Sequence, residues 1–140
     1  MMSISLARRW LQTLAVIHII GGLLLPVMVY TPLAATYFQH LQTAFPGSNP
    51  ESLRFLIGVF GPTVASWGLL FFYAIGKSFE SRTRKDWWVL VSATLVWAVL
   101  DTTFSLANNV VAHLYLNGSV LALFLIPLLL TKKYFQSQTT

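Results

Sequence analysis

Residues 87–130 read WWVLVSATLVWAVLDTTFSLANNVVAHLYLNGSVLALFLIPLLL and contain one charged side chain, Asp101. A membrane-spanning helix needs about 20 mostly apolar residues, because each residue adds about 1.5 Å against a hydrocarbon core of about 30 Å. The segments 87–107 and 110–130 both reach this length, and only two asparagines separate them. The stretch therefore predicts two membrane-spanning helices that are antiparallel neighbours.

Two further apolar runs of spanning length, 10–30 and 53–75, precede this stretch. Between them lies an outer loop, 31–52, and a cytoplasmic loop, 76–86, follows the second run. Over the whole chain 56% of the residues are apolar and 9% are charged, whereas soluble domains carry about 25% charged residues. We expect an all-α polytopic membrane protein with a single domain, 1–140, whose four transmembrane helices form a bundle of two antiparallel hairpins.

The basic residues predict the orientation of the four spans. Apart from Arg54, they all flank the spans on one side: Arg8, Arg9, Lys77, Arg82, Arg84, Lys85, Lys132 and Lys133. Because Lys and Arg collect on the cytoplasmic side, both termini are expected inside. We expect an integral protein of the bacterial inner (cytoplasmic) membrane.

Two features of the composition exclude other classes of function. The basic residues cluster at the ends of the spans, which excludes a nucleic-acid partner. The absence of cysteine excludes disulfides and thiolate metal sites.

The outer loop predicts a short amphipathic helix in the membrane interface. Pro32 can begin this helix, and Pro46 and Gly47 end it. Its apolar residues recur at helical spacing: Leu33, Tyr37, Phe38, Leu41, Ala44 and Phe45. The helix serves either as a connector on the membrane surface or as a lid over a cavity. Asn49 and Pro50 are expected to cap and begin the second span.

Polar residues inside the spans are the candidate functional residues, because ionisable groups are costly at bilayer depth. In the third span one face carries Thr94, Trp97, Asp101, Ser105 and Asn108. In the fourth span one face carries Asn109, His113 and Asn117. The short link places Asp101 and Asn117 at matching depth, where they could form a hydrogen bond, with His113 near Ser105 and Asn108.

The second span is expected to add a third wall to this polar cluster. A stripe of small residues permits close helix packing there: Gly58, Gly61, Ala65 and Gly68. Arg54 lies at the mouth and could reach inward or pair with Glu51. His18 is expected in the packing near Trp97, away from Asp101. The candidate ligand-binding residues are therefore Asp101, Asn117, His113, Ser105, Trp97, Arg54 and Asn108.

The layout is similar to that of the sterol-isomerase and sigma-2-receptor group. The shared features are four spans, cytoplasmic termini, a long first outer loop and a proline in the last span, here Pro127. The acidic residues of that group's first helix and outer loop have no clear match in this sequence. The resemblance therefore implies an architecture and no activity.

Three functions fit these features. The first is a non-catalytic protein that binds a lipophilic small molecule in an outer-half cavity, or an accessory subunit whose small-residue stripe docks a membrane partner or a second copy. The second is a cofactor-independent isomerase or dehydratase acting on a lipid-soluble substrate, with Asp101 and His113 as candidate catalytic residues. The third is a proton-coupled dimeric transporter that uses Asp101. Whether the protein is an enzyme stays open. The sequence shows no cofactor motif and no convincing metal site.

Overall fold

Four long helices dominate the computed structural model, which describes residues 2–136. Of these residues 87% are helical, and none lies in a strand. The long helices are α1 (Ile4–Met28), α3 (Pro50–Ser81), α4 (Arg84–Ala107) and α5 (Ala112–Thr131), and each is long and apolar enough to cross a membrane. Less than a third of each apolar stretch is buried inside the protein. An apolar surface of this extent indicates a membrane protein.

Two of the long helices extend beyond the apolar runs that predict them. The first helix begins at Ile4, where Ser3 caps it, and α3 continues to Ser81. Charged residues can stay helical where a span leaves the membrane, so hydropathy underestimates helix length. As a result, the expected loop 76–86 is reduced to Arg82 and Thr83 between α3 and α4. Arg82 has a φ of 51°, which ends α3 in a left-handed turn.

The outer loop contains two short helices. A 3₁₀ turn, η1 (Pro32–Ala34), leads into α2 (Ala35–Ala44), so a helix does form in this loop. The side chain of Asn49 accepts hydrogen bonds from the backbone of Glu51 and Ser52, and Pro50 is the first residue of α3. The predicted cap of the second span is therefore confirmed.

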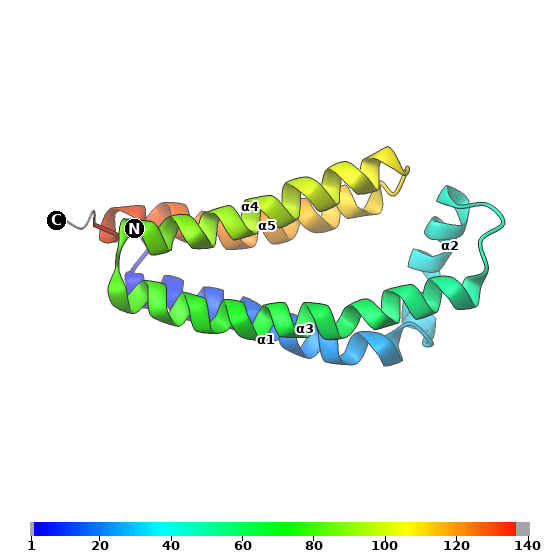
Figure 1. Cartoon of the computed structure of the whole chain (residues 1–140), viewed down its shortest axis with the longest axis horizontal. Helices are drawn as coiled ribbons and strands as arrows, with labels where there is room; N and C mark the ends of the chain where they lie inside the picture. Colours follow the sequence, from blue (N-terminus) through cyan, green and yellow to red (C-terminus); the bar gives the residue numbers. More distant parts are fainter. Residues whose placement is uncertain (1, 137–140) are drawn as a thin grey trace.

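The long helices pack as two pairs, α1 against α3 and α4 against α5. The pairs lie close together at the end that holds both termini and the α3–α4 connection, which we call the terminal end (Figure 1). They diverge toward the opposite end, which holds α2 and the α4–α5 turn and which we call the distal end. A large aromatic core near the terminal end includes Phe71, Trp87 and Phe124.

The small-residue stripe of α3 faces α1, which corrects the expectation that it forms a third wall of the polar cluster. Gly58, Gly61, Ala65 and Gly68 are all buried. A Cβ added at Gly22 of α1 would lie 2.4 Å from the backbone nitrogen of Ala65 and 2.6 Å from the carbonyl oxygen of Gly61. The close packing that small residues permit is therefore used within the chain, and this stripe is not free to dock a partner.

Candidate functional site

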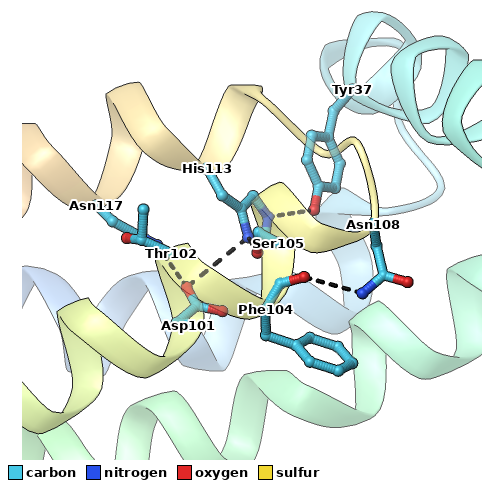
Figure 2. A network of polar contacts seen from close by, with 8 residues as sticks. All are labelled: Tyr37, Asp101, Thr102, Phe104, Ser105, Asn108, His113 and Asn117. Carbon is cyan, nitrogen blue, oxygen red and sulfur yellow. Dashed lines mark hydrogen bonds and ion pairs between the residues drawn. The ribbon is translucent and has the colours of Figure 1, made fainter.

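Asp101 and Asn117 join α4 to α5 about one and a half turns below the α4–α5 turn. The side-chain amide of Asn117 donates to Oδ2 of Asp101 at 2.7 Å and to Oγ1 of Thr102 at 3.0 Å (Figure 2). Asn117 is buried. The hydrogen bond predicted from matching depth is confirmed, whereas the part taken by Thr102 was not predicted.

His113 lies at the centre of the network, and both of its ring nitrogens have partners (Figure 2). Nδ1 lies 2.7 Å from the hydroxyl oxygen of Ser105, and Nε2 lies 2.8 Å from the phenol oxygen of Tyr37. Nδ1 also lies 3.7 Å from Oδ2 of Asp101. Hydroxyl and phenol groups can donate or accept, so both neutral tautomers and the protonated ring have partners.

Tyr37 of α2 is a member of the network that the sequence did not predict. The spacing along α2 places Tyr37 on its apolar face, and a buried phenol usually finds a polar partner. Burial raises the pKa of the Tyr37 phenol above its usual value, and the negative charge of Asp101 raises it further. The phenol therefore stays neutral at physiological pH and can donate a proton to a hydrogen bond.

The polar face of α4 contacts α5 through Asp101 and Ser105 and borders α3 through Trp97. Trp97, one turn before Asp101 on this face, lies near Trp67 of α3 with ring centroids 6.4 Å apart. Asp101 follows one turn later in α4, toward the distal end. The side chains of Asp101 and His113 are 36% and 24% exposed. The hydrogen bond from Asn117 and the contact with His113 both involve Oδ2, so part of this group is available to another molecule.

The side chains of three predicted site residues are not hydrogen-bonded to this network. Arg54 pairs with Glu51 at 2.6 Å and lies over the ring of Phe38, so it does not reach Asp101. Asn108 ends α4 and donates to the carbonyl of Phe104 at 2.9 Å. Trp97 borders the network through its position on the same helix face. The part of these three residues in ligand binding stays a prediction.

His18 lies apart from the polar network, as expected, but its neighbours differ from the prediction. Its ring packs against Trp67 and Phe124 with centroid distances of 5.2 and 5.5 Å. Its Nδ1 lies 2.8 Å from the carbonyl oxygen of Leu14, one turn earlier in α1. Trp97, the neighbour that the sequence predicts, is not among these ring contacts. The contacts are those of a hydrogen-bonded packing residue.

Comparisons with protein families, with curated proteins and with solved structures found no match to this chain. Within residues 2–136, no three His, Cys, Asp or Glu side chains gather in a way that could hold a metal ion. The network instead combines a carboxylate, an imidazole, two aliphatic hydroxyls, an amide and a phenol. Such a set can hold a polar group by hydrogen bonds.

Proposed function

We propose that this chain is an integral membrane protein that binds a lipophilic small molecule in the outer half of the membrane. The observation that carries the proposal is the partly exposed carboxylate of Asp101, held on one oxygen by Asn117. The ligand's polar group would reach Asp101 and His113, and its apolar body would lie between the two helix pairs. Trp67 and Trp97 would border the ligand on the side of the terminal end.

Energetics favour a role for Asp101 beyond stabilising the hairpin. An ionisable side chain at bilayer depth costs roughly 2.5–3.5 kcal/mol on insertion scales. A hydrogen bond between membrane helices contributes about 0.6 kcal/mol on average. Asp101 accepts a hydrogen bond from Asn117 of α5 and has a more distant contact with His113. These contacts offset only part of the cost, so the residue is better explained by an interaction with a ligand.

The chemistry of the network defines the ligand class. A carboxylate accepts hydrogen bonds, so the ligand should carry a hydroxyl or amine group that donates one. The surrounding apolar surface favours a long hydrocarbon or ring system on the same molecule. A lipid alcohol, a sterol-like alcohol or a long-chain amine has both features.

We further propose an orientation with both termini in the cytoplasm and the two helix pairs as antiparallel hairpins. Eight of the nine basic residues lie on the terminal end, which supports this orientation through the positive-inside rule. In this arrangement α2 lies in the outer membrane interface. Leu33 and Tyr30, near its start, expose much apolar surface, which supports contact with lipid.

Lipidomics of the purified protein tests the binding proposal. We expect wild-type protein, purified in a mild detergent, to retain a lipophilic alcohol or amine that Asp101→Asn loses. Asparagine keeps the size of the side chain, removes its charge and replaces one acceptor oxygen by an amide group that donates hydrogen bonds. The matched control is Thr103→Ala, since Thr103 is exposed and lies two residues away on α4. Equal retention by all three proteins, or no retained molecule in the wild type, contradicts the proposal.

Acid–base catalysis is a second candidate, and the position of His113 between Asp101 and Tyr37 favours it. Isomerisation or dehydration would need only proton transfer among such groups. The test incubates purified protein with a membrane lipid extract and follows products of unchanged mass or of mass reduced by one water. Products formed equally by wild type and Asp101→Asn rule this function out.

A further inference from the structure

A depression at the terminal end lies apart from the Asp101 network, which is at the other end of α4. It has a volume of about 390 Å³, within the range of about 300–1,000 Å³ that is typical of small-molecule sites. Three basic and three apolar side chains line it: Arg84, Lys132, Lys133, Leu129, Leu130 and Phe135. A ligand that fits this lining combines negative charge with hydrocarbon.

Backbone hydrogen bonds bring these distant residues together. The 3₁₀ turn η2 (Lys132–Tyr134) follows α5 and returns the chain to the α3–α4 connection. The backbone nitrogen of Arg84 donates to the carbonyl of Gln136 at 2.8 Å, and the nitrogen of Gln136 donates to the carbonyl of Arg82 at 2.9 Å. Phe135 is buried against Phe79 of α3. The basic residues are therefore positioned by a defined fold of the chain.

The charge at this end of the molecule favours an anion. The terminal end carries eight basic and two acidic residues. Glu80 pairs with Arg8 and lies 3.7 Å from Lys77, whereas Asp86 bonds to the hydroxyls of Ser81 and Thr83. Both acidic side chains are thus engaged away from the depression, whose lining is basic and apolar.

The basic residues of the depression lie beside exposed apolar side chains of α5. The ammonium of Lys132 lies 5.2 Å from the centre of the Trp87 ring, which is buried and bonded to the Leu128 carbonyl. Leu129 and Leu130, one turn deeper in α5, are about half exposed. A molecule with its charge at Lys132 and its chains along these leucines would be aligned with the surrounding lipid.

We propose that this depression binds the phosphodiester headgroup of an anionic phospholipid. Arg84 and Lys132 hold the phosphate, because guanidinium and ammonium groups form charge-assisted hydrogen bonds with phosphate oxygens. The acyl chains lie along Leu129 and Leu130. The lipid thus contacts α4 and α5 at the connection between the two helix pairs.

Native mass spectrometry of delipidated protein tests this site, with dioleoyl phosphatidylglycerol and dioleoyl phosphatidylcholine as the two probes. We expect the wild type to prefer phosphatidylglycerol. The double variant Arg84→Gln/Lys132→Gln should bind it roughly tenfold more weakly, because two charges that face the phosphate are removed. The control Arg9→Gln/Lys77→Gln removes two charges from the same end, outside the depression, and should change the affinity less than about twofold. If the first double variant does not fold, Lys132→Gln alone, at an exposed residue, provides the comparison.

Three results would overturn the proposal. Equal weakening in both double variants indicates diffuse attraction to the whole basic surface. No weakening in Arg84→Gln/Lys132→Gln places the bound lipid elsewhere. Displacement of phosphatidylglycerol by millimolar inorganic phosphate indicates a site for free anions, which lack the acyl chains that Leu129 and Leu130 would contact.

Discussion

Replacing Gly22 by alanine should separate α1 from α3. The added Cβ would lie 2.4 Å from the Ala65 nitrogen and 2.6 Å from the Gly61 carbonyl oxygen. Ordinary contacts between such atoms are about 3.5–4.0 Å, so the two helices must move apart by about 1 Å. The obstructing atoms belong to the backbone and cannot rotate away, so no change of side-chain conformation relieves the clash.

The neighbouring residue Gly21 provides a matched control. A Cβ at Gly21 meets nothing within 4 Å, and both substitutions gain the same helix propensity, about 1 kcal/mol. The difference between the two variants therefore isolates the cost of overpacking, typically about 1–3 kcal/mol. We expect Gly22→Ala to have a free energy of unfolding lower than that of Gly21→Ala by this amount.

Reversible unfolding in mixed dodecylmaltoside and sodium dodecyl sulfate micelles measures this difference through tryptophan fluorescence. The contrast should also appear in Gly61→Ala, whose added Cβ would lie 2.5 Å from the Gly22 carbonyl oxygen. If Gly21→Ala and Gly22→Ala unfold at the same detergent composition, the close α1–α3 packing described above is wrong.

Three further predictions concern the contacts that join the helices. Tyr37→Phe removes the hydrogen bond to His113 and should lower the free energy of unfolding by about 0.5–1.5 kcal/mol; an unchanged value in the same micelle titration refutes that contact. Folding raises the pKa of the Tyr37 phenol through burial and the charge of Asp101, so its stability contribution should persist below pH 10 and fall as the pH rises through the raised pKa. The tyrosinate absorbance at high pH should show this late titration, and Tyr37→Phe should lack it. Trp87→Phe removes the buried hydrogen bond to the Leu128 carbonyl, 2.9 Å long, and should lower the free energy of unfolding by about 1–3 kcal/mol. If the variant is as stable as the wild type, this hydrogen bond does not stabilise the packing of α4 against α5.

Hydropathy and capping chemistry were enough to place the helices of this chain. Apolar length identified four long helices, and Asn49 with Pro50 identified the start of α3. The ends of α1 and α3 were less predictable, since a helix can continue into water with charged residues such as Lys77 and Glu80. Helix length depends on hydrogen bonds and caps, whereas hydropathy reports only the part suited to lipid.

Within one short hairpin, side-chain contacts could also be predicted. Asp101 and Asn117 meet because the turn at Asn108 and Asn109 fixes the relative depth of α4 and α5. The contact between His113 and Ser105 follows from the same constraint. Where a short connection determines geometry, spacing along the sequence is sufficient to identify neighbours.

Contacts between separate helix pairs could not be predicted in the same way. The stripe around Gly61 could have packed against any helix, and its partner is α1, where Gly22 and Ala15 are also small and buried. Tyr37 joins the network because α2 is positioned against the α4–α5 turn, which is a tertiary arrangement that periodicity within α2 does not specify. Small residues on both partners were the available signal for the first contact.

Photo-crosslinking tests most directly the central claim that the Asp101 network binds a lipophilic molecule. A long-chain alcohol with a diazirine next to its hydroxyl group, irradiated with the membrane-embedded protein, should label the peptides that contain Asp101 and His113. The labelling should saturate, and excess unmodified alcohol should suppress it. Labelling confined to the lipid-exposed surface of the helices, and unchanged by the competitor, would contradict the claim.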